Sequence, residues 1–249
     1  MENSNKPIFA ALSSELHSPV SIIQQNIESL KMHCIHKDID FSEETFSLAE
    51  EAIQNILGIV ENFQFLNNSD QLKKNINPQW FSLHDLLIQI DKELRIFNLD
   101  TSRLKLLSMP RHLHIFLDKD LINRILFNLL NNALKFSAKK VELNISLIKN
   151  KLIFTVRDFG IGIPDIQLSE IFKPFVKGKN ASKFPGTGIG LSIVARAVEA
   201  LDGTVSVHSE SGNETEFQVV IPYSHSRAAN YKPMNKKIIN RNKIHLNYD

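Results

Sequence analysis

The stretch NLLNNALKFS, residues 128–137, places two asparagines four positions apart within an apolar run that favours a helix. Residues four apart lie on the same face of an α-helix, so the amides of Asn128 and Asn132 point the same way. Amide oxygens are neutral ligands, which suit a magnesium ion whose charge is already offset by nucleotide phosphates. Lys135, one turn further on, can reach a phosphate. Alone, this pattern is a weak signal, because most paired asparagines on helices bind nothing.

A second stretch, DFGIGIP at residues 158–164, places an acid at a strand end before two glycines. A buried Asp158 carboxylate can accept a hydrogen bond from an adenine amino group. Gly160 and Gly162 would let the base lie against the backbone. The letters DFG also occur in Ser/Thr/Tyr protein kinases, but the upstream glycine loop, lysine strand and HRD loop of that class are missing from the sequence. The sequence therefore excludes that class.

A third stretch, GTGIGL at residues 186–191, runs into a predicted helix N-terminus. Gly186, Gly188 and Gly190 supply flexible backbone, and the N–H groups and dipole of a helix start can hold a polyphosphate. The spacing is not that of the dinucleotide-binding GxGxxG motif, and no strand leads directly into it. This stretch is also weak when taken alone.

The segments around these motifs predict an α+β sandwich with helices on one face of a mixed sheet. A helix should begin at Ser82, with Asp85 three residues on as in a capping box. The polar, proline-containing stretch 67–80 marks a domain boundary. Further helices are expected at 121–136 and about 190–201, and strands at 104–107, 114–116, 141–147, 152–157, 204–209 and 215–221.

The first 70 residues predict a helical hairpin. Apolar residues spaced by threes and fours form one stripe over 9–34 and a second over 46–63. Two helices cannot bury such stripes alone. The simplest way to bury them is a symmetric four-helix bundle formed by two chains. The alternative is a hairpin packed on the rest of its own chain. We therefore expect three regions: a dimerisation and phosphoacceptor-like hairpin (1–70), an α/β sandwich domain (71–224) and a basic tail (225–249), either flexible or a docking arm.

Charge, cysteine content and hydropathy limit the classes of protein to which this chain can belong. A net charge of +2 gives no reason to expect a nucleic-acid partner. The single cysteine, Cys34, rules out a disulfide framework and reads as a buried thiol. No run approaches the ~20 apolar residues of a membrane span, and the N-terminus lacks a signal-peptide pattern. We expect a cytoplasmic chain, either by itself or as the cytoplasmic part of a longer membrane-bound sensor.

Taken together and in order, these motifs resemble the catalytic ATP-binding domain of sensor histidine kinases, a Bergerat-type fold. The match includes the lead-in DKDLINRILFNLL (118–130), the asparagine box, both glycine boxes and the phenylalanine box IFKPF (171–175). SGNETEF (211–217) resembles the closing GxGTxF, with Thr215 on the adenine side, but has Glu214 where glycine is usual. The resemblance implies ATP and Mg²⁺ as cofactors, with Asn128 and Asn132 serving the metal. The nucleotide-binding set it implies is Asn128, Asn132, Lys135, Asp158, Gly160, Gly162, Phe172, Lys177, Gly186, Thr187, Gly188, Gly190, Leu191 and Thr215.

The acceptor motif of the family's dimerisation helix reads HELRTP, and SELHSP (14–19) aligns with it from Ser14. A serine hydroxyl needs a base to become a nucleophile, whereas imidazole is already nucleophilic near neutral pH. His17 lies one helical turn from Ser14, also outside the apolar stripe, but has no carboxylate three or four residues away. Glu15 and Ser18 match the family's E-x-x-T pair, in which the hydroxyl orients a water. The catalytic candidates are therefore His17, Glu15, Ser14 and Ser18.

Three functions remain open on sequence alone. The first is an ATP-dependent histidine kinase that uses His17 or is weakly active. The second is an ATP-binding pseudokinase that acts as a homodimeric scaffold or as a response-regulator phosphatase. The third, another Bergerat-type ATPase, is disfavoured because such ATPases lack this hairpin with its ELxxP remnant. Expected partners are a second copy of the chain and a response-regulator receiver domain or another kinase.

Overall fold

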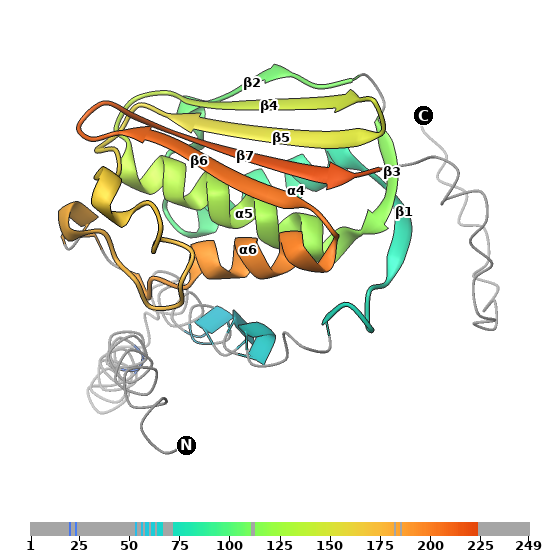
Figure 1. Ribbon diagram of the computed structural model, residues 1–249, viewed down its shortest axis with the longest axis horizontal. Helices are drawn as coiled ribbons and strands as arrows, with labels where there is room; N and C mark the ends of the chain where they lie inside the picture. Colours follow the sequence, from blue (N-terminus) through green and yellow to red (C-terminus); the bar gives the residue numbers. More distant parts are fainter. Residues whose placement is uncertain are drawn as a thin grey trace, which may run out of the picture.

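The computed structural model describes residues 72–110, 113–181, 183–184 and 186–223, with shorter helical pieces between 20 and 66 (Figure 1). Those pieces are Val20, Ile23, Ile53, Ile56 and residues 58–59, 61–62 and 64–66. Most of the two predicted apolar stripes, Cys34 and the tail (225–249) lie outside the described residues, so the hairpin and its dimer stay predictions.

A five-stranded mixed sheet forms one layer of the described fold, in the order β2-β4-β5-β7-β6. β2 runs parallel to β4, and the other neighbouring pairs are antiparallel. Side chains alternate along each central strand, so that Leu152, Phe154 and Val156 of β5 are buried while the residues between them face outward. The strands are β2 Leu104–Ser108, β4 Val141–Ile148, β5 Lys151–Asp158, β6 Thr204–Glu210 and β7 Glu214–Pro222.

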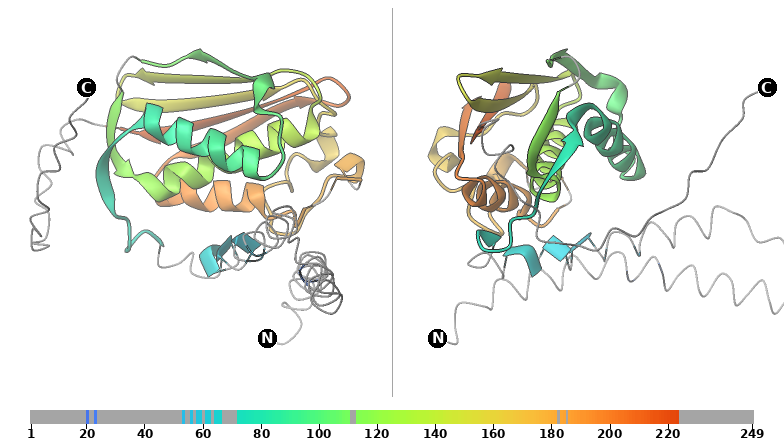
Figure 2. Two further views of the ribbon diagram at one scale, coloured as in Figure 1. Left: turned by 180° about the vertical axis from the view of Figure 1, so that it is seen from behind. Right: turned by 90° about the vertical axis from the view of Figure 1, so that its right-hand side faces the viewer.

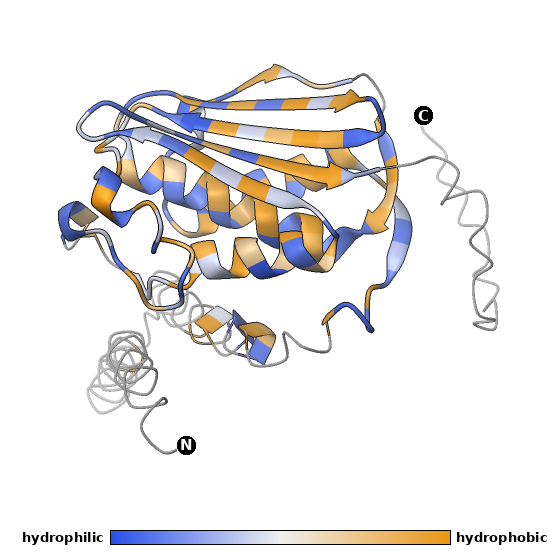
Figure 3. Cartoon of the chain, in the orientation of Figure 1, coloured by the Kyte–Doolittle hydropathy of each residue, from blue (hydrophilic) through white to orange (hydrophobic). Residues whose placement is uncertain are grey.

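Three helices cover one face of this sheet: α4 (Leu83–Ile96), α5 (Lys119–Phe136) and α6 (Gly190–Ala200). Figures 1 and 2 show all three on the same side, and Figure 3 shows apolar residues concentrated where the helices meet the sheet. The predicted two-layer α+β arrangement, with helices on one face of a mixed sheet, is confirmed. None of the helices in the described part of the chain is long and apolar enough to cross a bilayer.

Side-chain caps fix where two of the helices begin. The Ser82 hydroxyl accepts the Asp85 N–H at 3.2 Å, as the sequence predicted. Asp118 caps α5 by accepting the N–H groups of Asp120 and Leu121 at 3.0 and 3.1 Å. Because this cap precedes Lys119, α5 begins two residues earlier than the apolar pattern indicated.

One strand was not predicted. β1 (Pro78–Ser82) begins within the stretch predicted as a domain boundary and pairs antiparallel with β3 (His114–Asp118) in a separate two-stranded sheet. In β1 only Phe81 is buried, so the segment has no alternating pattern to mark it as a strand. The stretch 67–80, which the sequence marks as a domain boundary, therefore contains the first three residues of a strand. β3 was expected as a strand, but it joins β1 and not the main sheet.

Short 3₁₀ turns complete the described fold at Thr101–Arg103, Asp165–Gln167 and Lys179–Ala181. Two of them lie in the long connection between β5 and α6, residues 159–189. This connection passes the C-terminal end of α5 and carries both glycine-rich motifs, so it forms one wall of the site described next.

Candidate nucleotide-binding site

Three polar residues form a row across the end of the main sheet. Asp158 of β5 lies directly opposite Thr215 of β7, which lies opposite Ser209 of β6. All three are buried among the inward-facing side chains. The hydroxyls of Ser209 and Thr215 are 2.9 Å apart, close enough to share a hydrogen bond. Two of the three, Asp158 and Thr215, were predicted for the adenine side, and strand register brings them together.

Burial changes the chemistry of Asp158, a residue that is only 5% exposed. Desolvation raises the pKa of this carboxyl from 3.8 to about 6, and the charge of Glu214 adds to the rise. The Gly160 N–H, which donates to Asp158 Oδ1 at 3.0 Å, acts in the opposite direction. A carboxylate has room for several further donors. Asp158 is therefore a buried acceptor suited to one specific polar ligand group.

The turn after β5 needs glycine at two positions. A side chain at Gly160 would collide with the carbonyl oxygen of Phe136, the last residue of α5. Gly162 has φ +62°, and a side chain there would collide with the carbonyl of Glu210. The Ile161 N–H donates to the Phe136 carbonyl at 3.2 Å. Backbone packing against α5 and β6 thus demands these glycines, in addition to the role near the base expected from sequence.

The other motifs meet at the N-terminus of α6. A Cβ at Gly190 would lie 3.0 Å from Asn128 Oδ1 and 3.8 Å from Asn132 Nδ2. A Cβ at Gly186 would lie 2.7 Å from Lys135 Nζ. Asn128 Nδ2 donates to the Arg124 carbonyl at 2.8 Å, which leaves its amide oxygen turned toward Gly190. The structure therefore brings the asparagine stretch of α5 against the second glycine stretch.

The remaining predicted residues shape the connection between β5 and α6. The Thr187 hydroxyl accepts the Ile189 N–H at 3.3 Å, ahead of α6. Phe172 packs edge-on against Phe217 at 6.3 Å, and Leu191 packs against the core. Lys177 is exposed on the connection.

Gly188 has φ +74°, a backbone conformation that side chains disfavour. The acceptor-helix candidates Ser14, Glu15, His17 and Ser18 lie outside the described residues, so their roles stay predictions.

Two residues that the sequence did not single out hold this region together. The Ser209 hydroxyl donates to the Glu214 carbonyl at 2.7 Å and accepts the Ile163 N–H at 2.9 Å, which joins the glycine turn to the end of the sheet. Asn180 donates to the Gly162 carbonyl at 2.8 Å from 18 residues away. An inward position on a strand could have marked Ser209, but no local pattern marks Asn180.

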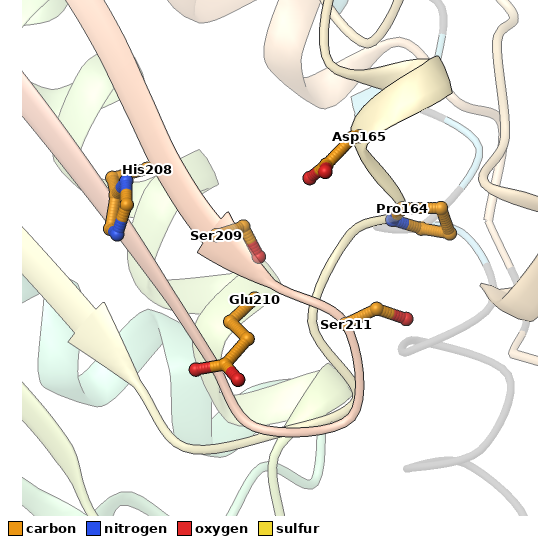
Figure 4. A pocket seen from close by; sticks show the side chains of 6 residues that line it. All are labelled: Pro164, Asp165, His208, Ser209, Glu210 and Ser211. Carbon is orange, nitrogen blue, oxygen red and sulfur yellow. The ribbon is translucent and has the colours of Figure 1, made fainter.

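An open surface depression lies beside this site, lined by Pro164, Asp165 and residues 208–211 (Figure 4). It shares Ser209 with the polar row but includes none of the α5 residues. Figure 4 shows the side chains of Asp165, His208 and Glu210 pointing apart instead of converging. Among the described residues, no group of three or more His, Cys, Asp or Glu could hold a metal.

Comparison with known proteins places this arrangement in a family. Residues 117–225 match the family described as histidine kinase-, DNA gyrase B-, and HSP90-like ATPase. The autoinducer 2 sensor kinase/phosphatase LuxQ of Vibrio vulnificus (strain CMCP6) is 30% identical over 245 residues, covering 92% of this chain and 28% of the relative. The sensor protein kinase WalK of Staphylococcus aureus (strain MRSA252) is 25% identical over 229 residues, covering 89% of this chain and 37% of the relative.

The chain thus spans less than two fifths of the length of these relatives. Among solved structures, the Acinetobacter baumannii histidine kinase AdeS superimposes with a TM-score of 0.60 at 22% identity, covering 84% of this chain and 96% of that one. This likeness establishes the fold.

Proposed function

Because this chain belongs to the sensor histidine kinase family, we propose that it binds Mg-ATP at the site on α5 and acts in two-component or phosphorelay signalling. The observation that carries the proposal is that four motifs separate in sequence meet around one end of α5. They are the asparagine stretch (128–137), the two glycine stretches (158–164 and 186–191) and the closing stretch 211–217. The Asp158 and Thr215 row lies at one side of that end, and Asn128, Asn132 and Lys135 face the 186–190 loop at the other. The unusual Ser14 would leave autophosphorylation impaired.

The adenine would lie at the buried end of the site. An ionised Asp158 would accept the exocyclic amino group of the base, which is a hydrogen bond that discriminates adenine from guanine. Gly160 and Gly162 would allow the ring to approach the backbone, and Thr215 would contact it through its hydroxyl. The raised pKa of Asp158 supports this role, because a desolvated carboxyl gains from a donor that arrives with the ligand.

The phosphates would lie between α5 and the start of α6. Lys135 and the backbone N–H groups near Gly186, Gly188 and Gly190 offer donors, and the α6 dipole favours negative charge there. The amide oxygen of Asn128 faces Gly190, which fits a neutral ligand for Mg²⁺, with Asn132 as its neighbour. When bound, Mg²⁺ supplies the charge that neutralises the triphosphate. Phe172, Lys177 and Thr187 of the 159–189 connection, with Leu191 of α6, would complete the wall of the site.

We further propose that residues 1–70 form a dimerisation hairpin, residues 71–224 the ATP-binding domain and residues 225–249 a basic tail. Val20 and Ile53, one from each predicted stripe, are 41% and 45% exposed in the single chain, so a second copy could cover them. A second copy is thus the first expected partner, and a receiver domain or another kinase is the second. The cytoplasm is the compartment where ATP and a receiver domain would meet this chain.

The acceptor step would be slow. Transfer to His17 would form a bond from an imidazole nitrogen to the γ-phosphorus and break the bond to the β-phosphate oxygen, releasing ADP. No carboxylate lies three or four residues from His17 to receive the imidazole proton. A positioned general base contributes about a hundredfold to ten-thousandfold, so its absence predicts weak labelling.

Incubation with γ-labelled ATP tests the acceptor assignment. Any label should disappear in His17→Ala, persist in Ser14→Ala and be lost in acid, as phosphohistidine is. Ser14→His places an imidazole directly before Glu15 and should label well above wild type. Rapid wild-type labelling that is acid-stable and absent from Ser14→Ala would refute the view that Ser14 is a vacated acceptor position.

Calorimetry with an unreactive ATP analogue tests the nucleotide site separately. Asp158→Asn should weaken binding by about tenfold to a hundredfold, because a hydrogen bond to a charged group is lost. Asp165→Asn makes the same chemical change on an exposed residue and should leave the affinity unchanged. Absence of binding to the folded wild type would end the proposal.

A second candidate function is dephosphorylation of a receiver domain. It is favoured by the Glu15 and Ser18 pair and by the relative LuxQ, which is named as both kinase and phosphatase. The test uses a receiver domain phosphorylated by acetyl phosphate and measures its loss of phosphate with added chain. Ser18→Ala should abolish any acceleration, while Ser14→Ala should retain it.

A further inference from the structure

Arg103 ties the C-terminal end of α5 to the turn before β2. Its guanidinium donates to the backbone carbonyls of Leu134 at 3.0 Å, Ser137, and Lys139 at 3.3 Å. Asp100 accepts from Arg103 Nε at 3.2 Å and orients the group. The Arg103 side chain is only 21% exposed. Its carbonyl partners lie more than 30 residues away in sequence, so the contact joins distant segments of the chain.

Leu134 lies in the last turn of α5 and Ser137 caps it, and the carbonyls at a helix end lack intrahelical donors. The end of α5 also carries partial negative charge from the helix dipole, which a cation offsets. An arginine can satisfy several carbonyls at once, since its five N–H groups form a rigid planar fork. Arg103 therefore fixes both the position and the direction of the final turn of α5.

That final turn contacts the nucleotide site on two sides. Lys135 belongs to it, and its Nζ lies beside Gly186. The carbonyl of Phe136 accepts the Ile161 N–H at 3.2 Å and limits the space at Gly160. Gly160 in turn donates to the Asp158 carboxylate at 3.0 Å. A shift at the end of α5 would consequently move the phosphate donor and the adenine acceptor together.

We propose that Arg103 is a positioning residue for ATP, which acts through the C-terminal turn of α5 without touching the nucleotide. This inference rests on the proposed function, because it assigns Arg103 to the geometry of that same site. It predicts that loss of the guanidinium weakens ATP binding even in molecules that remain folded. It also predicts a local change at Ile161 that requires no nucleotide.

The experiment compares Arg103→Gln and Arg103→Lys with two controls in the full chain. Arg95→Gln removes the same charge from the surface of α4, where the guanidinium bonds to Asp91. Ile122→Val trims a fully buried side chain of α5 and lowers stability without altering the helix end. Affinity for an unreactive ATP analogue is measured at a temperature where every variant is folded, and exchange of the Ile161 amide is measured without nucleotide.

Arg103→Gln should weaken ATP binding by about tenfold, within the range typical of coupling between a remote residue and a binding site, and should speed exchange of the Ile161 amide. Arg103→Lys keeps the positive charge but not the planar guanidinium, so its ATP affinity and Ile161 exchange rate should lie between those of Arg103→Gln and wild type. Both controls should bind like wild type. Wild-type affinity and wild-type Ile161 exchange in folded Arg103→Gln would overturn the inference; if that variant does not fold, the same result in Arg103→Lys overturns it.

The proposed function fails separately. If the wild type binds no ATP, the nucleotide assignment is lost, while the Ile161 exchange result still decides whether Arg103 positions the glycine turn.

Discussion

ATP binding should weaken as the pH falls below about 6, because the adenine acceptor Asp158 becomes protonated. Desolvation raises the pKa of this carboxyl from 3.8 to about 6 in the nucleotide-free protein. A neutral carboxyl presents an O–H donor where the adenine amino group needs an acceptor. Affinity should therefore be full above the raised pKa and should fall by about tenfold for each pH unit below it, until the pKa of the bound state is reached.

The same burial has an opposite effect on the stability of the nucleotide-free protein. The raised pKa corresponds to about 3 kcal/mol against the ionised form. This contribution to stability is fully present below pH 3.8, where Asp158 is neutral in both states, and is lost as the pH rises through about 6. Asp158→Asn should therefore stabilise the nucleotide-free fold at neutral pH by up to about 3 kcal/mol while it weakens ATP binding. An unchanged melting temperature would contradict the assignment of burial as the cause.

Calorimetry of an unreactive ATP analogue across this pH range measures the effect directly. Because the triphosphate also titrates, the wild type is compared with Asp158→Asn at each pH, and the difference reports the carboxyl alone. Near pH 5.5 wild-type binding should release a proton, seen as a dependence of the heat on the buffer's ionisation enthalpy. Identical pH profiles for the two proteins would refute the reasoning, because Asp158 would then not change its protonation on binding.

Three further predictions concern the glycine turn, the metal and the dimer. Gly162→Ala should lower the free energy of unfolding by at least about 2 kcal/mol, because φ is +62° and the methyl would meet Glu210 backbone. Gly212→Ala, at φ +80° in open space, should cost about 1 kcal/mol in the same denaturation assay, and equal losses would contradict the steric account. Asn132→Asp places a negative charge beside the triphosphate, and the repulsion between them should weaken ATP binding by about tenfold in calorimetry. Asn144→Asp, on the exposed face of β4, should leave the affinity unchanged. Residues 78–224 expressed alone should be monomeric in light scattering, and the full chain dimeric; a monomeric full chain at micromolar concentration would remove the bundle proposal.

Sequence by itself determined the parts of this protein that depend on local chemistry. The Ser82 cap and the apolar runs predicted α4, α5 and α6, and each strand of the main sheet was expected within one residue of its observed bounds. The motif residues on α5 were also readable, because residues three and four apart on a helix share a face whatever surrounds them. The order of the motifs was sufficient to indicate the family.

Only tertiary structure decided the contacts between segments distant in the chain. The strand register that sets Asp158 opposite Thr215 and the approach of Gly190 to Asn128 both depend on packing between elements far apart in sequence. β1 could not be predicted because only one of its residues is buried, so no alternating pattern marks it. Its backbone pairing with β3 is what makes it a strand. Arg103 and Asn180 carry no local signal, since the carbonyls they bond belong to other elements. Hydrogen bonds to remote backbone depend on where the chain returns, and that is determined by the burial of the core as a whole.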